Sequence, residues 1–160
     1  MDLPATLSLA VSTTMLKNFR FSGELLWTQW SAYENLKFNY DQSPGTGQEG
    51  IVEVNKDWDD VWCVRFGVEY YLNDQWTFRL SYAWDESPID DDYRDPSLST
   101  NDRNIFGFGV GWAWNQLTVD AAYSYVAVED AKVGKKATPT LDGTYKGDAH
   151  IANLSFSWTF

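Results

Sequence analysis

Four charged residues stand out because each lies in an alternating, strand-like segment among small side chains: Arg65, Glu69, Arg79 and Asp120. A charge in such surroundings must pair with an opposite charge or remain hydrated. With a turn at residues 73–74, Glu69 and Arg79 fall opposite or diagonal to each other on neighbouring strands. Two interpretations stay open. The charges form a salt-bridge network that stiffens an interior wall, or Arg65 or Arg79 meets the carboxylate of a ligand.

The remaining candidates for chemistry are weaker. His150 is the single histidine, and the spacing builds no Ser, His and Asp cluster, so we expect no enzymatic activity and no cofactor. Cys63 is expected to be a small interior filler rather than a nucleophile. Asp90, Asp91 and Asp92 could bind a hard cation such as Ca²⁺, but "WDESPIDDDYRDPS" lacks the glycine and spacing of an EF-hand loop. We expect a solvated acidic loop there instead.

The composition favours one domain and excludes nucleic acid as a partner. The chain has 160 residues, 44% of them hydrophobic and 17% aromatic, which is compatible with a single domain over residues 1–160. Its 12 basic and 23 acidic residues give a formal charge of -11, which repels a polyphosphate. The sequence contains no run of about 18 apolar residues, as a membrane-spanning helix would need.

A period of two residues runs through almost the whole sequence and predicts β-strands. In "WTFRLSYAWD" one face is entirely large and apolar, while the other is small or polar, and "IFGFGVGWAW" and "LTVDAAYSYVAV" divide in the same way. Short turns alternate with long polar loops around residues 41 to 59, 86 to 102 and 129 to 146. We therefore expect an antiparallel meander of about seven strands. The strings "ENLKFNY" and "GIVEVN" are expected to pair as a hairpin beyond the main sheet.

The chemistry of the two strand faces indicates which one meets lipid. A water-soluble sandwich is rich in Lys, Glu and Thr on the face away from its core, whereas here that face is mostly Gly, Ala and Ser. Gly107, Gly109 and Gly111 would keep an interior wall low and leave room for an elongated ligand. The apolar face carries aromatic rings at its ends, as at a membrane interface. The predicted fold is an all-β, antiparallel transmembrane β-barrel in the bacterial outer membrane, in contact with membrane lipid and lipopolysaccharide.

The last strand, "ANLSFSWTF", alternates large apolar residues with small polar ones up to its final position. Phe156, Trp158 and Phe160 fall on the face expected to meet lipid. This ending resembles the C-terminal aromatic signal of outer-membrane proteins, which implies recognition by the barrel-assembly machinery. We expect it to be the C-terminal end of the native protein.

Several strings resemble the C-terminal half of the FadL-type transporters, outer-membrane channels for long-chain fatty acids and other hydrophobic compounds. They include "LPATLSLAVS", "WTQWSAYENLKFNY", "NDRNIFGFGV", "GTYKGDAHIANLSFSWTF" and, as the most specific, "DWDDVWCVRFGVEYYLNDQWTFRLSYAWDESPI". The resemblance implies a fourteen-stranded barrel whose last seven strands lie here, with the N-terminal plug and the early strands absent from residues 1–160. It also implies passive uptake of long-chain fatty acids or similar hydrophobic molecules.

An odd number of strands leaves two open edges whose strands run in the same direction. If this half barrel exists alone, closure on itself or on a twin in a homodimer would need parallel seams. Two other functions stay open. One is a small structural or adhesive outer-membrane barrel with a filled lumen and no transport, and the other is a soluble, aromatic-rich β-sandwich with carbohydrate affinity.

Overall fold

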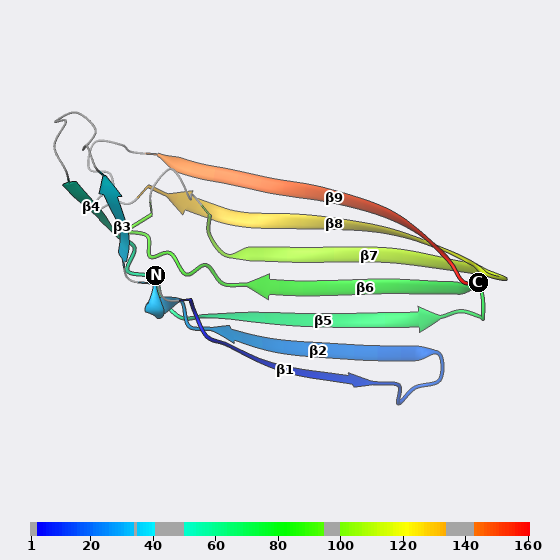
Figure 1. The fold of residues 1–160 in the computed structure, drawn as a ribbon. Coiled ribbons are helices and arrows are strands. Elements are labelled where there is room, and N and C mark those ends of the chain that lie inside the picture. Colours follow the sequence, from blue (N-terminus) through cyan, green and yellow to red (C-terminus); the bar gives the residue numbers. More distant parts are fainter. Residues whose placement is uncertain (1–2, 34, 41–49, 95–99, 134–142) are drawn as a thin grey trace.

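The computed structural model describes residues 3–33, 35–40, 50–94, 100–133 and 143–160, and apart from one short 3₁₀ turn their regular secondary structure is β-strand. Seven strands form one sheet in the order β1-β2-β5-β6-β7-β8-β9 (Figure 1). Their bounds are β1 (Thr6–Thr13), β2 (Phe19–Thr28), β5 (Val61–Tyr71), β6 (Trp76–Asp85), β7 (Arg103–Trp114), β8 (Leu117–Lys132) and β9 (Thr144–Trp158). All neighbouring pairs are antiparallel. The predicted all-β, antiparallel meander of seven strands is confirmed.

A second, two-stranded sheet interrupts the meander between β2 and β5. It pairs β3 (Asn35–Tyr40) with β4 (Gly50–Asn55) and follows a short 3₁₀ turn at Trp30–Ala32. Figure 1 shows this hairpin beyond one end of the main sheet, as the sequence predicted. Within the described residues, no helix is long and apolar enough to cross a membrane.

Asparagines build the short turns at the opposite end of the sheet. Asn18 and Asn115 adopt the left-handed conformation, with φ of 66° and 52°, which asparagine tolerates better than most residues. The Oδ1 atom of Asn73 accepts hydrogen bonds from the backbone N–H groups of Gln75 and Trp76, both at 2.9 Å. The short connections therefore define a turn end of the sheet, and the long connections define a loop end.

β8 and β9 extend into the segment around residues 129 to 146 that the sequence predicted as loop. The pairing continues past a register shift between Val128 and Ala131, because a bulge absorbs the extra residue. At the bulge, the Nζ atom of Lys146 lies 2.5 Å from Oδ2 of Asp130. The sequence did not predict strand here because this part of β8 and β9 is rich in charged, exposed residues. The regular alternation of apolar and polar residues that marks the rest of the sheet is missing from it.

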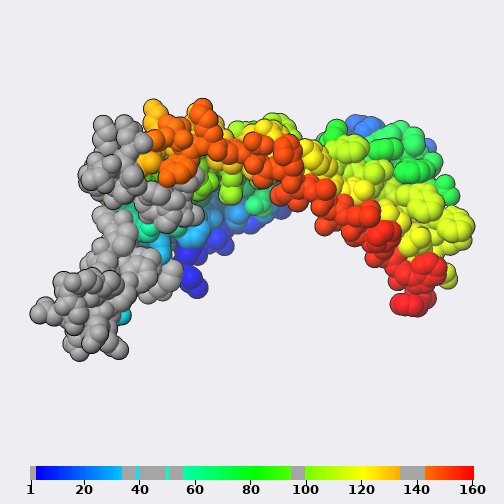
Figure 2. All heavy atoms as spheres, turned by 90° about the horizontal axis from the view of Figure 1, so that it is seen from above, coloured from blue at the N-terminus to red at the C-terminus, as the bar shows by residue number. Residues whose placement is uncertain are grey.

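The main sheet is a single layer without an apolar core packed against it. Among the described residues, the buried hydrophobic side chains are Val61, Cys63, Ile89 and Ala131. Large exposed apolar side chains include Leu9, Phe66, Leu80, Phe108 and Leu154. Within the described part, the strands of this sheet make substantial contacts only with their hydrogen-bonded neighbours, so β1 and β9 remain edges. β9 (orange to red) runs along an uncovered margin (Figure 2), and every residue in it is exposed.

The apolar band on one face is staggered across the sheet. Register pairing joins Phe19 of β2, through the intervening strands, to Leu154 of β9. Phe19 is the residue at the turn end of β2, whereas β9 continues from Leu154 to Trp158. Offset strand ends of this kind arise when the strands of a barrel are tilted against its axis. The sheet therefore has the geometry of a barrel segment.

Candidate functional site on the polar face

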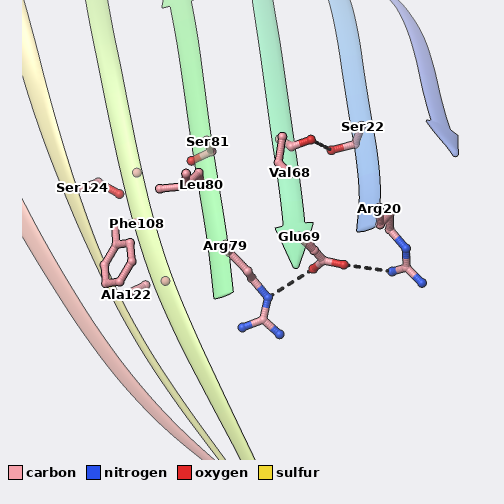
Figure 3. A pocket seen from close by; sticks show the side chains of 13 residues that line it. Arg20, Ser22, Val68, Glu69, Arg79, Leu80, Ser81, Phe108, Ala122 and Ser124 are labelled. Atoms are coloured by element: carbon pink, nitrogen blue, oxygen red, sulfur yellow. Dashed lines mark hydrogen bonds and ion pairs between the residues drawn. The ribbon is translucent and has the colours of Figure 1, made fainter. Parts of the chain in front are cut away.

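A chain of ion pairs runs from β2 to β8 across the polar face of the sheet. The Nη1 atom of Arg20 lies 3.3 Å from Oε2 of Glu69, and Oε1 of Glu69 lies 3.1 Å from Nε of Arg79. The Nη1 atom of Arg79 lies 2.7 Å from Oδ1 of Asp120. The hydroxyl of Tyr71 donates to Glu69 at 2.5 Å. Arg20, Glu69 and Arg79 point toward one another from β2, β5 and β6 (Figure 3), and with Asp120 they form what we call the turn-end network.

Glycines on β7 leave the space that this network crosses. In the strand register, Gly109 is opposite Arg79 and Gly111 is opposite Asp120. A Cβ atom at Gly111 would lie 2.6 Å from Oδ1 of Asp120 and 3.0 Å from Nη1 of Arg79. At Gly109 the corresponding contact with Cβ of Arg79 would be an ordinary 3.5 Å. Two of the three glycines predicted to form a low wall therefore lie under Arg79, and the guanidinium occupies the space above Gly111.

A second group of polar contacts, the loop-end network, lies nearer the long connections. The Nη1 atom of Arg65 lies 2.8 Å from Oε2 of Glu24, whose Oε1 atom accepts a hydrogen bond from the Ser8 hydroxyl at 2.8 Å. Arg103 is ion-paired with Asp85. The sequence prediction grouped Arg65 with Arg79, but in the structure the two arginines pair with carboxylates in separate clusters.

A row of small residues separates the two networks. We call it the Ser/Gly row, and its members are joined by the strand register in the order Ser12, Ser22, Gly67, Ser81, Gly107 and Ser124. At Gly107 the neighbouring Ser81 hydroxyl already fills the space, since an added Cβ atom would lie 2.2 Å from its Oγ. Part of this row and three members of the turn-end network, Arg20, Glu69 and Arg79, line a shallow hollow of about 360 Å³ (Figure 3). Hydroxyl groups and backbone form its floor, and fixed charges stand beside it.

The ion pairs determine what the polar face can do with an anionic ligand. Arg65 and Arg79 are 49% and 41% exposed, so each remains accessible while paired. A ligand carboxylate would have to compete with Glu24 or with Asp120 for its arginine. An ion pair as exposed as that of Arg79 and Asp120 contributes about 0.2–1 kcal/mol, so such an exchange has a small free-energy cost.

Sequence reasoning missed Arg20 and Glu24. Both lie in "FRFSGELLW", at alternate positions that they share with Ser22, opposite a face that carries Phe19, Phe21, Leu25 and Trp27. The same period of two would have placed them on the polar face. Tyr71, the third contact of Glu69, sits at the end of β5, where alternation gives a weaker signal.

In the acidic loop, where a solvated loop was the prediction and a cation site the weaker alternative, Asp90 and Asp91 contact other residues of the same loop. Asp91 is ion-paired with Arg94, and Oδ1 of Asp90 accepts a hydrogen bond from the backbone N–H of Asp92 at 2.7 Å. In the described ranges, no group of three His, Cys, Asp or Glu residues could hold a metal ion. The Asp95 position lies outside the described residues.

Of the other predicted residues, His150 and the C-terminal aromatic residues lie apart from the two networks, whereas Cys63 borders the loop-end network opposite Asp85. His150 is exposed in the middle of β9, with Nδ1 2.5 Å from the Tyr123 hydroxyl and Nε2 3.1 Å from Oδ2 of Asp148. Cys63 is buried at the loop end of β5. At the C-terminus, large exposed aromatic rings end the chain, and these are Phe156, Trp158 and Phe160.

A single-layer antiparallel sheet with an exposed apolar face, an ion-paired polar face, tight turns at one end and long loops at the other is the wall of a transmembrane β-barrel. A family model described as outer membrane protein transport protein (OMPP1/FadL/TodX) matches residues 1–160. The chain belongs to this family, and it is a protein of the bacterial outer membrane.

Known proteins of the family resemble the chain over most of its length. The long-chain fatty acid transport protein of Salmonella typhi is 28% identical over 141 residues, which cover 85% of this chain and 30% of the relative. Alkane uptake protein A of Marinobacter nauticus is 25% identical over 158 residues, or 89% of this chain and 33% of the relative. A crystal structure of a Pseudomonas aeruginosa FadL homologue matches with a TM-score of 0.82 at 26% identity, covering 97% of this chain and 35% of that one. The chain thus spans about a third of the length of these proteins.

Proposed function

We propose that this chain forms part of the wall of a passive outer-membrane channel for hydrophobic molecules, with long-chain fatty acids as the first candidates. One observation carries the proposal. The sheet has an exposed apolar face, and on its opposite, polar face the small side chains of the Ser/Gly row leave space for a ligand. The relatives named for transport of long-chain fatty acids and for uptake of alkanes support this ligand class. Their shared chemistry is a long, flexible hydrocarbon chain.

In the proposed passage, the hydrocarbon chain crosses the Ser/Gly row and lies over Gly109, where an added Cβ atom makes only ordinary contacts. A carboxylate head group exchanges with Asp120 at Arg79, or with Glu24 at Arg65, and gains a charge-assisted hydrogen bond in return. Because these contacts are shallow and exposed, the ligand is held weakly and leaves readily. Movement follows the concentration gradient and needs neither a cofactor nor a covalent step.

We further infer that residues 1–160 supply seven strands of a fourteen-stranded barrel and that the remaining strands and a plug belong to the rest of a longer protein. β1 and β9 are open edges that run in the same direction, so closure by antiparallel seams requires an odd number of additional strands. The length of the matched relatives supports this inference. A homodimer of two such chains would need parallel seams, and the barrel-assembly machinery would act on the C-terminal aromatic residues.

Uptake by intact cells tests the proposed function. Gram-negative cells without another fatty acid channel would be supplied with a radiolabelled long-chain fatty acid, with and without the protein in their outer membrane. The channel predicts faster uptake when the protein is present, with unchanged permeability to a small hydrophilic solute. Equal uptake in both strains, with the protein correctly inserted, would indicate a structural or adhesive barrel with a filled lumen.

A further inference from the structure

Arg94 is the most deeply buried charged residue in the described part of the chain. Its side chain is 1% exposed, and it lies in the connection between β6 and β7. We give the name β6–β7 loop to the described residues of this connection, 86–94 and 100–102. A buried guanidinium destabilises a fold unless all its N–H groups find acceptors. The acceptors of the Arg94 guanidinium therefore show which segments of the chain this side chain links.

All five N–H groups of Arg94 have acceptors. Nε donates to the carbonyl of Thr100 at 2.9 Å. Nη2 donates to the carbonyl of Ile89 at 3.0 Å and to Oδ1 of Asn101 at 3.2 Å. Nη1 donates to the carbonyl of Lys132 at 3.4 Å and is ion-paired with Asp91. One side chain thus ties both halves of the β6–β7 loop to the end of β8.

Further hydrogen bonds attach the same loop to its neighbours. On the β5 side, the backbone N–H of Glu86 donates to the carbonyl of Trp62 at 3.1 Å, and the N–H of Asp59 donates to the carbonyl of Pro88 at 2.9 Å. On the β8 side, Nδ2 of Asn101 donates to the carbonyl of Asp130 at 2.9 Å. The loop therefore lies against the loop ends of both β5 and β8.

Burial shows which face of the sheet this loop covers. Val61 and Cys63, on the polar face of β5, are 6% and 5% exposed, whereas Trp62 between them is 43% exposed. Arg65, the next residue on the same face, is exposed again. Ile89 of the loop is itself buried. A cover over the polar face at the loop end explains this pattern. The segment from Glu86 to Ile89 is hydrogen-bonded to Trp62 and Asp59 beside these residues, and Asp85, which precedes it, is opposite Cys63 in the strand register.

We propose that Arg94 is a positioning residue that holds the β6–β7 loop folded over the polar face at the loop end and so restricts which hydrophobic molecules enter the passage. The restriction of entry rests on the proposed channel function, whereas the position of the loop does not. Arg94 acts through the loop backbone and touches no ligand. Its loss frees the carbonyl groups of Ile89, Thr100 and Lys132, and the loop opens.

The buried thiol of Cys63 reports on the loop directly. Intact cells carrying the native protein would be treated with a membrane-impermeant maleimide, and modification of Cys63 would be quantified by mass spectrometry. Arg94→Ala should raise the labelling rate by about tenfold or more, because labelling follows the open population. Arg94→Lys keeps the charge but cannot span the five acceptors, so it should label nearly as fast. The matched change Arg20→Ala at the turn end should leave the rate unchanged.

Correct assembly of each variant is verified by the heat-dependent migration of folded barrels in electrophoresis. If Arg94→Ala does not assemble, Arg94→Lys carries the test, and Asn101→Ala, which removes one acceptor, should give a smaller increase in labelling. Unchanged labelling of Cys63 in an assembled Arg94 variant would overturn the proposal. Restoration of the wild-type rate by lysine would overturn it as well, because charge alone would then suffice.

Uptake separates this inference from the proposed function. Arg94→Ala should raise the uptake of a bulky hydrophobic probe relative to that of a linear fatty acid severalfold, since the opened loop no longer restricts entry. An unchanged ratio, with faster Cys63 labelling, would overturn the role of the loop at the entrance. Absence of any protein-dependent uptake in the wild type would contradict the channel itself, and the labelling experiment would still decide the position of the loop.

Discussion

The guanidinium of Arg79 bridges an intervening strand. Its Nη1 atom lies 2.7 Å from Oδ1 of Asp120, although β7 separates the strands β6 and β8 that carry the two residues. The bridge forms because Gly111 places no side chain in its path. An ion pair of this kind links strands that share no backbone hydrogen bonds, and it fixes the position of the positive charge on the polar face.

Substitution of Gly111 tests the bridge. Gly111→Val should destabilise the folded protein by about 1–3 kcal/mol, because the new side chain overlaps Asp120 and the Arg79 guanidinium. Gly109→Ala is the matched control, since its Cβ atom makes ordinary contacts. Unfolding in urea, followed by tryptophan fluorescence in lipid vesicles, measures both. Equal stability of the two variants would contradict the bridge.

Removal of the Asp120 charge should change ligand preference. In Asp120→Asn the guanidinium of Arg79 loses its strongest competitor for a ligand carboxylate, so uptake of a fatty acid should rise severalfold relative to that of its methyl ester. The control Asp130→Asn breaks an exposed pair with Lys146 near the loop end and should leave the ratio unchanged. Parallel changes for acid and ester in Asp120→Asn would show that Arg79 does not meet the head group.

A larger side chain at Gly109 should narrow the passage. Gly109→Leu is expected to reduce fatty acid uptake without abolishing assembly, because the site has ordinary contact distances and no tight neighbour. At Gly147, near the loop end of β9, an added Cβ atom meets nothing within 4 Å, so Gly147→Leu should transport normally. Normal uptake by a correctly inserted Gly109→Leu protein would contradict the role of this wall position.

The sequence was sufficient to predict the meander, because the alternation of apolar and polar residues along a strand is a local signal. It divided β5 to β8 correctly, and it placed Arg79 and Asp120 on one face. The sequence could not predict that Arg79 and Asp120 pair across β7, because the pairing depends on the register of three strands and on the space above Gly111. Arg94 was missed for a similar reason: three of its five acceptors are the backbone carbonyls of Ile89, Thr100 and Lys132, which the sequence cannot identify as partners.

The C-terminal aromatic residues should affect assembly. Phe160→Ser is expected to lower the folded fraction in the outer membrane severalfold if this ending is the signal read by the barrel-assembly machinery. Ser157→Ala, a change on the opposite face of the same strand, should have little effect. Heat-dependent electrophoretic migration measures the folded fraction, and wild-type assembly of Phe160→Ser would remove the basis for that partner.

The most direct test of the channel proposal is to block the polar face. In a Cys63→Ser background, Ser81→Cys places a thiol in the Ser/Gly row, and Leu80→Cys places one on the exposed apolar face of the same strand. Fatty acid uptake by intact cells would be measured before and after treatment with a bulky, water-soluble thiol reagent. A channel whose ligand moves along the polar face predicts that the reagent abolishes most uptake in Ser81→Cys and leaves Leu80→Cys unaffected. Unchanged uptake in fully labelled Ser81→Cys protein would contradict it.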